Sequence, residues 1–262
     1  MRKAKGDYAI LTVTNALRLL EEFRGEMEIG VAELGRRLRL HKNNVFRLLA
    51  TLEEAGYIEQ NAATGRYRLG IAALQLGQAF ARTRPLLTRG PAYLEELAAT
   101  TTESAHMAML DGFEVVHVAG AAPDRMVASS LRVGRRLPVH CTALGKVLLG
   151  CAPDAEREAF DKQVVNARGL EVRTRRSIHD PAKFFEHVRT VAGQGFALDL
   201  EECEEGLSCA AAPVHDVTGR VVAAISVSVP SSRADEHRLL ERILPQVSGA
   251  AERLSRELGH HL

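Results

Sequence analysis

Apolar residues recur at intervals of three and four in three stretches near the start of the chain. This spacing predicts helices over residues 8–23, 31–38 and 43–55. Thr12 is the expected N-cap of the first helix, and Gly25 is its expected stop. The third helix carries a narrow apolar stripe, as a helix packed on a core does. Its opposite face is polar, holds no carboxylate, and consists of Asn43, Asn44, Arg47 and Thr51.

The pattern changes from helical to strand-like after Gly56. Residues 57–60 and 66–69 are two short strand-like runs, and the loop between them contains Gly65, which predicts a β-hairpin. Three helices followed by a hairpin is the element order of a winged helix-turn-helix. In that fold the third helix enters the major groove of DNA, and the hairpin tip reaches the neighbouring backbone or minor groove.

Beyond residue 70 the chain mixes both patterns. Residues 71–80 predict a linker helix that Arg84-Pro85 interrupts, and a further helix is expected at 91–99. Asp111-Gly112 predicts a tight hairpin between two strands. The strands expected are 104–110, 114–119, 196–200, 207–213 and 221–229, and the later helices are 142–149, 180–192 and 235–258. This order predicts an α+β domain around an antiparallel sheet.

Composition narrows the class of protein. With 262 residues, 46% hydrophobic and 26% charged, the chain is long enough for two ordinary domains and too apolar for general disorder. The longest apolar run, residues 221–229, is far shorter than the roughly 20 residues of a membrane span, so we predict a cytoplasmic protein with no membrane partner. Four cysteines without a CxxC pair predict reduced thiols and no structural zinc.

Positive charge is concentrated near the start of the chain. Residues 1–70 hold 12 Lys and Arg against 9 Asp and Glu, while the rest holds 22 against 24. No acid falls between Leu34 and Leu52, where the basic residues are Arg36, Arg37, Arg39, Lys42 and Arg47. An ordinary solvated face is the alternative, but the helix order, the acid-free third helix and the basic hairpin together favour DNA binding.

Several strings resemble the IclR family of bacterial transcription regulators. In the first half they are residues 12–20, 32–34, 42–52, 56–57 and 64–70; in the second half they are residues 137–146, 201–202, 206–214 and 224–228. The resemblance spans about residues 8–258 and implies a winged helix-turn-helix followed by a GAF-like effector-binding domain. The family usually has Ser-Thr at Asn43-Asn44 and glycine at Arg39, so the operator sequence cannot be taken from relatives.

The helix face and the hairpin supply the DNA-binding candidates. Asn43, Asn44 and Arg47 are predicted to face the major groove, where asparagine can pair bidentately with adenine. The residues expected nearer the phosphates are Lys42, Arg66 and Arg68. A single winged helix offers few contacts, so we expect a homodimer or homotetramer on duplex operator DNA, with part of the contact on the linker helix.

The resemblance also implies an effector pocket in the second domain. Its lining would be Leu137, Ala143, Leu144, Asp199, Leu207, Cys209, Ser226 and Ser228. Ser226 and Ser228 lie two apart on one strand, so both hydroxyls project from the same face. The free N–H groups at the start of helix 142–149 favour an anion. These features predict a small organic acid or aromatic metabolite, with Asp199 selecting a hydroxyl or protonated group; alternatively, both serines bond only backbone or water.

Other chemistry is less well supported. Gly145-Lys146 lacks the remaining residues of a phosphate loop. On a strand, His140 and Cys141 would point to opposite faces, which separates base from nucleophile. We therefore predict no enzyme, no cofactor and no metal. The alternatives are a GAF-like thiol enzyme or redox sensor acting through Cys141 or Cys209, and a winged helix that binds protein.

These expectations divide the chain into three parts. Residues 8–70 form the winged helix-turn-helix, residues 71–84 the linker helix, and residues 85–262 the effector-binding domain.

Overall fold

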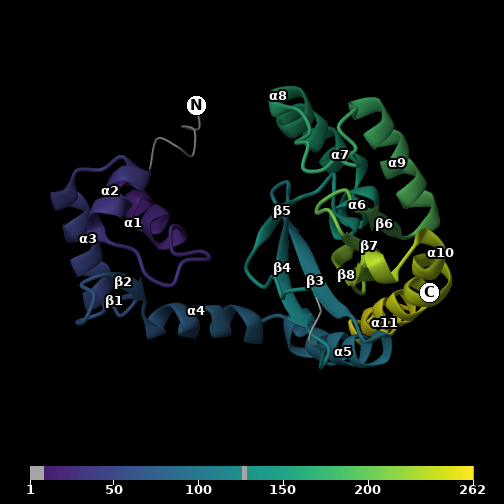
Figure 1. Ribbon diagram of the computed structural model, residues 1–262, viewed down its shortest axis with the longest axis horizontal. Helices are drawn as coiled ribbons and strands as arrows, with labels where there is room; N and C mark the ends of the chain where they lie inside the picture. The colour runs from purple at the N-terminus through teal and green to yellow at the C-terminus, as the bar shows by residue number, and fades with distance from the viewer. Residues whose placement is uncertain (1–8, 126–128, 262) are drawn as a thin grey trace. The chain divides into compact units, whose positions relative to one another are not determined.

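The computed structural model describes residues 9–125 and 129–261, so Tyr8, the predicted first residue of the first helix, lies outside it. The chain forms two compact units, one ending at Thr83 and the other beginning at Arg84 (Figure 1). Each unit has its own apolar core. Among the described helices, none has the length and apolar content needed to cross a bilayer.

The first unit is a helical bundle with a hairpin and a final helix. Its elements are α1 (Leu11–Glu21), α2 (Val31–Leu38), α3 (Lys42–Glu54), β1 (Ile58–Gln60), β2 (Tyr67–Leu69) and α4 (Ile71–Arg82). The antiparallel pair β1–β2 is extended by Ile29, which exchanges two backbone hydrogen bonds of 2.9 Å with Tyr67. The predicted winged helix-turn-helix is confirmed. Thr12 is not the cap, because α1 begins at Leu11 after Ile10, which makes no side-chain cap bond.

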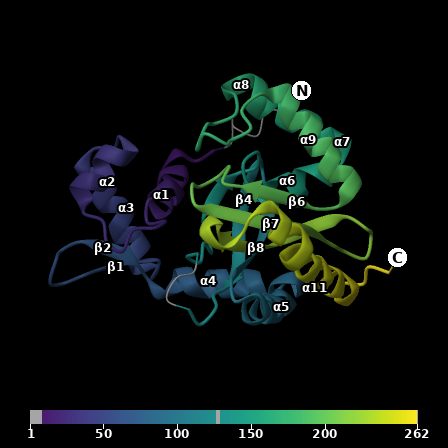
Figure 2. The ribbon, with the colours of Figure 1, turned by 45° about the vertical axis from the view of Figure 1, so that its right-hand side comes forward.

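The second unit is built on a six-stranded antiparallel sheet in the order β5-β4-β3-β8-β7-β6 (Figure 1). Figure 2 shows strands β4, β6, β7 and β8 of this sheet from a second direction. Its strands are β3 (Ser104–Asp111), β4 (Glu114–Ala121), β5 (Arg136–Pro138), β6 (Ala197–Leu200), β7 (Leu207–His215) and β8 (Val221–Pro230). Its helices are α5 (Pro85–Thr101), α6 (Ala143–Gly150), α7 (Asp154–Phe160), α8 (Asn166–Arg168), α9 (Pro181–Gln194), α10 (Glu236–Arg238) and α11 (Leu244–Glu257). The predicted α+β class is confirmed.

Alternate residues of the central strands serve two separate cores, as the pleat requires. On one face Met107, Ile225 and Val227 pack with apolar residues of α5 and α11. On the other face Ala211 and Ala224 pack with residues of α6 and α9. The small side chains on this second face leave room for polar groups next to α6.

Two expectations about helices are wrong, and two short elements were missed. The helix expected from residue 91 begins at Pro85, with Pro91 inside it; the packing of Leu94 and Leu97 outweighs the lost backbone bond. The helix expected over 235–258 is divided by a π-helical turn, Leu239–Ile243, just before Pro245, which cannot donate an N–H. The short elements β5 and α7 were not predicted, because three to seven residues carry little periodic signal.

Candidate functional site

Helix α3 presents the polar face that its sequence predicted. Lys42, Asn43, Asn44 and Arg47 are all exposed, whereas the stripe on the other side is buried in the core of the first unit. His41 caps the helix, its Nδ1 accepting a hydrogen bond of 3.4 Å from the backbone N–H of Asn43. The Asn43 side chain is therefore not the cap.

The cations of this surface differ in how far they are already paired. Arg66 donates to the backbone oxygen of Glu28 at 2.9 Å and to the carboxylate of Glu33 at 3.3 Å. Arg68 donates to Glu59 at 2.5 Å. In the part of the chain that the structure describes, no ion pair involves Lys42 or Arg47. These two are the cations best placed to contact phosphate or base.

Phe46 is a candidate that sequence reasoning missed. It lies on α3 beside Arg47, and 57% of its surface is exposed. An exposed aromatic side chain on a reading helix can contact the methyl group of thymine. The signal was available, because Phe46 falls outside the apolar stripe although it is large and apolar.

All eight residues predicted to line an effector pocket lie around the same cavity in the second unit. They come from five elements, namely β5, α6, β6, β7 and β8. Four more residues complete the wall: His117, Arg132, Thr142 and Cys203. The cavity has a volume of about 30 Å³, which is room for about two water molecules but not for an organic ligand. An organic ligand therefore enters only if lining side chains move.

Strand register places the polar residues in one row across the sheet. Asp199 of β6 lies opposite Cys209 of β7, which lies opposite Ser228 of β8. Farther along, Ser226 lies opposite His106 of β3. Directly opposed residues of antiparallel strands share a face, so these side chains project to the same side. Ser228 is partnered by Cys209, with 3.2 Å between Oγ and Sγ.

The start of helix α6 forms one end of the cavity. Thr142 is its N-cap, accepting from the backbone N–H of Gly145 at 3.1 Å. Ala143 and Leu144 line the cavity and are buried, so the first turn of α6, where backbone N–H groups lack partners within the helix, lies at the cavity. A Cβ at Gly145 would lie 2.4 Å from the backbone oxygen of Val139, so only glycine lets the preceding turn close against this helix.

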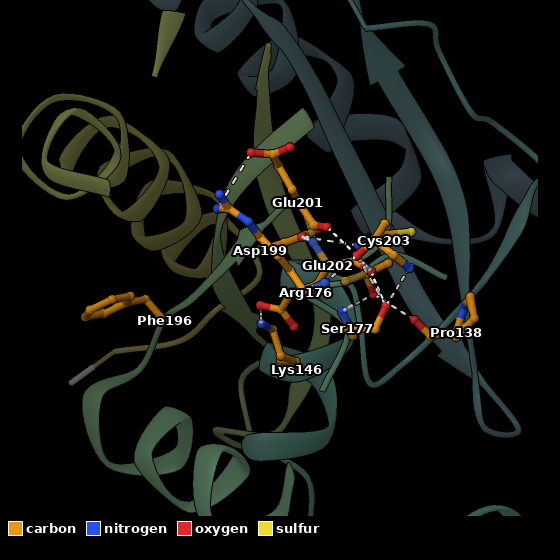
Figure 3. A network of polar contacts seen from close by, with 12 residues as sticks. Pro138, Lys146, Arg176, Ser177, Phe196, Asp199, Glu201, Glu202 and Cys203 are labelled. Atoms are coloured by element: carbon orange, nitrogen blue, oxygen red, sulfur yellow. Dashed lines mark hydrogen bonds and ion pairs between the residues drawn. The ribbon is translucent and has the colours of Figure 1, made fainter. Parts of the chain in front are cut away.

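A buried ion pair, Lys146 and Glu202, lies close to Asp199 (Figure 3). Lys146, fully buried, holds Glu202 at 2.5 Å between Nζ and Oε1. The carboxylate of Asp199 accepts backbone N–H bonds from Glu202 at 2.7 Å and Cys203 at 3.4 Å. Burial nevertheless raises the pKa of Asp199 to about 8, since the nearby Lys146 charge only partly offsets desolvation. Asp199 is therefore mostly protonated at neutral pH and can donate a hydrogen bond.

The geometry weighs against a reactive thiol at Cys141 or Cys209. His140 and Cys141 lie in a turn after β5 and not on a strand, so the expectation that strand geometry separates them was wrong. His140 is nevertheless occupied, because its Nε2 is hydrogen-bonded to the backbone oxygen of Glu171 at 2.8 Å. A hydrogen bond to Cys203 and burial raise the pKa of Cys141, and burial raises that of Cys209. Neutral thiols are poor nucleophiles.

The cysteines do not form a metal site with their neighbours. Within residues 9–125 and 129–261, no three His, Cys, Asp or Glu side chains are grouped to hold a metal ion.

Comparison with known proteins covers both units. The bacterial transcriptional regulator IclR C-terminal model matches residues 78–256, and the IclR helix-turn-helix domain model matches residues 12–62. The chain is 32% identical over 252 residues to the HTH-type transcriptional regulator XynR of Escherichia coli K12, covering 96% of this chain and 98% of XynR.

Solved structures agree with this match. A transcriptional regulator from Rhodococcus sp. RHA1 gives a TM-score of 0.82 at 26% identity, over 95% of this chain and 98% of that one. The C-terminal domain of E. coli KdgR, solved alone, gives a TM-score of 0.58 at 32% identity, over 68% of this chain and 100% of that one. The chain belongs to the IclR family of bacterial transcriptional regulators, and it is a DNA-binding regulator that responds to a small-molecule ligand.

Proposed function

We propose that α3 reads operator DNA in the major groove through Asn43, Asn44 and Arg47. The phosphate contacts assigned beside it are Lys42, Arg66 and Arg68. The support is the exposure of all three reading side chains on a helix whose opposite side is buried. In this assignment residues 8–70 bind DNA and residues 85–262 bind the effector. Residues 71–84 form the linker helix between these two parts.

Fluorescence anisotropy with operator and random duplexes over a range of salt concentrations tests the assignment. Asn44→Ala should lower the ratio of operator to random affinity, because an asparagine–adenine pair discriminates by about 1–3 kcal/mol. Arg66→Ala should weaken both duplexes alike and reduce the salt slope by up to about one unit. Arg24→Ala, on an exposed arginine paired with Glu21 outside this surface, is the control. If both test variants bind like the control, α3 is not the reader.

We infer further that the cavity beside α6 binds a small carboxylic acid or aromatic metabolite as the effector. The observation that carries this is the convergence of all eight motif-matched residues on one cavity. The first-turn N–H groups of α6 and the hydroxyls of Ser226 and Ser228 suit a carboxylate, while Leu137 and Leu144 suit an apolar portion.

Calorimetry against a panel of acids, together with release from operator DNA, tests the pocket. The double variant Ser226→Ala/Ser228→Ala should lose about 1.5–3 kcal/mol of binding, roughly tenfold or more, if the hydroxyls bond a charged group. Ser248→Ala, in α11 and away from this cavity, is the matched control. A ligand that releases the parent protein from DNA but binds the double variant unchanged would place the pocket elsewhere.

The proposal also covers where the protein acts and how it assembles. The chain acts in the cytoplasm, where bacterial DNA lies, without enzymatic activity of its own. It binds operator as a homodimer or homotetramer. The support for self-association is α4, in which no residue is buried although Leu74 and Leu76 are apolar.

A further inference from the structure

Two histidines, His106 and His117, lie on the cavity face of the sheet, and the proposed carboxylate contacts use neither of them. His106 on β3 is 1% exposed and His117 on β4 is 3% exposed. Their ring centroids are 5.5 Å apart, and the rings meet edge to face at 84°. His117 lines the cavity itself, and His106 lies opposite Ser226, which also lines it.

A break in strand register brings this pair together. The pairing of β3 with β4 shifts between Met107 and Ala108, so that His117 lies opposite Ala108. Ala108 shares the pocket face with His106, because the two residues are two positions apart along the strand. At this break β4 has one residue more than β3. Without that extra residue, His117 would project to the opposite face, among the apolar residues that contact α5 and α11.

Most of the ring nitrogens of this pair are unpaired. Within residues 9–125 and 129–261, neither nitrogen of His106 nor Nδ1 of His117 has a hydrogen-bond partner. A buried polar atom without a partner costs stability, so such groups persist where a ligand or a bound water satisfies them. His117 lines the cavity, so a ligand bound there is close to these nitrogens.

Both rings are neutral at physiological pH. Burial, together with the positive charge of Arg132, lowers the pKa of His106 to about 3 and that of His117 to about 4. Arg132 is itself paired with Glu204 at 2.5 Å. A hydrogen bond to the backbone of Arg135 raises the pKa of His117, whereas the charge of Arg135 lowers it. A neutral imidazole has one N–H donor and one lone-pair acceptor, so the three unpaired nitrogens include at least one of each.

We propose that the effector carries a hydroxyl group in addition to its acidic group, and that this hydroxyl binds between the imidazoles of His106 and His117. The proposal rests on the effector pocket proposed above and names its second polar end. A hydroxyl both accepts and donates, and so matches one N–H and one lone pair. A carboxylate only accepts, an ammonium group only donates and would approach Arg132, and an apolar group would leave the nitrogens unpaired.

Calorimetry on the full-length protein tests the proposal with three matched pairs of acids. The pairs are 4-hydroxybenzoate and benzoate, lactate and propionate, and 3-hydroxybutyrate and butyrate. The hydroxylated member of at least one pair should bind about tenfold or more tightly than its partner. Equal affinities in every pair, or no binding by any of the six acids, would overturn the proposal.

Variants separate a ligand contact from a merely structural role. His106→Phe and His117→Phe keep a ring and remove the nitrogens, so each should abolish the preference for the hydroxylated acid while raising the melting temperature. His117→Asn, which keeps polar atoms near Nδ1, should retain part of the preference. His187→Phe, at a half-buried histidine on α9 outside the cavity, is the control.

The remaining outcomes distinguish this proposal from the pocket itself. If the double serine variant weakens both members of a pair while the histidine variants leave their ratio unchanged, the pocket stands and the histidine subsite is wrong. Succinate tests a second carboxylate at the same place. Stronger binding of succinate, with proton uptake revealed by buffer-dependent binding enthalpy, would mean that the histidines become charged around a carboxylate, and would also overturn the proposal.

Discussion

At the scale of single residues, the cations proposed to contact DNA differ in the ion pairs that they must break to do so. Arg68 already donates to Glu59, so a phosphate has to displace a carboxylate, whereas Arg47 enters the groove without breaking an ion pair. We expect Arg47→Ala to weaken operator binding clearly more than Arg68→Ala, with a fall in the salt slope of about one unit for Arg47→Ala. Anisotropy titrations at four salt concentrations measure both. Equal losses would show that the pairing with Glu59 does not persist in the complex.

Asp199 gives the C-terminal unit a specific pH dependence. Its pKa is about 8 in the folded state and near 3.9 when unfolded, so between these values unfolding releases a proton. The free energy of unfolding should therefore fall as pH rises across this window, by up to about 1.4 kcal/mol per pH unit, and level off above pH 8. Asp199→Asn keeps an oxygen for the backbone N–H groups and removes this contribution.

Urea unfolding of residues 84–262 at pH 5, 6, 7 and 8 measures the effect. The corresponding domain of KdgR has been crystallised alone, which supports the use of this fragment. The advantage of the asparagine variant over the parent should grow with each step in pH. Parallel pH profiles for the two proteins would show that Asp199 ionises normally in the folded state.

At the scale of elements, the end of α2 holds a strained residue. Arg39 adopts a left-handed conformation, with φ of 56°, in the turn before α3. Glycine adopts this conformation without the cost, about 1 kcal/mol, that a side chain incurs. Arg39→Gly should therefore raise the melting temperature of the first unit, whereas Arg39→Ala, which loses the same charge but keeps the strain, should not. Equal melting temperatures for both variants would contradict this explanation.

The elements that periodicity predicts well are those whose local pattern and tertiary role agree. Helix α3 and the hairpin were placed within a residue or two because the buried stripe and the turn residues are local signals. Pro91 and Pro245 were misread because packing on the sheet decides whether a helix tolerates proline, and packing is not visible in a single segment.

The effector site was predictable in part for the same reason. Motif strings identified the eight residues now found around the cavity, including the serine pair that strand alternation places on one face. His117 was missed because its orientation depends on a register shift, which no local sequence signal reveals. Arg132 was missed because it reaches the cavity from an irregular segment.

At the scale of the whole molecule, the proposed self-association would cover the exposed apolar residues of α4. Leu74 and Leu76 of α4 are 59% and 61% exposed, and a second copy would bury this helix. Leu74→Glu/Leu76→Glu should shift the sedimenting species toward monomer and weaken operator binding, because a monomer engages only half of a two-fold site. Gln75→Glu, one added charge on the same helix, is the control. An unchanged sedimentation profile would exclude α4 from the interface.

The two-faced sheet of the C-terminal unit also bears on how such a regulator can diverge. Neighbouring positions along β3 and β8 have different surroundings, since one faces the proposed ligand cavity and the next packs in the core under α5 and α11. If the proposed effector site is right, substitutions at Ser226, Ser228 or His106 change which metabolite is sensed and leave the packing under α5 and α11 in place. A duplicated gene could acquire a new inducer by exchanging every second residue of two strands, while the intervening residues preserve an inherited scaffold.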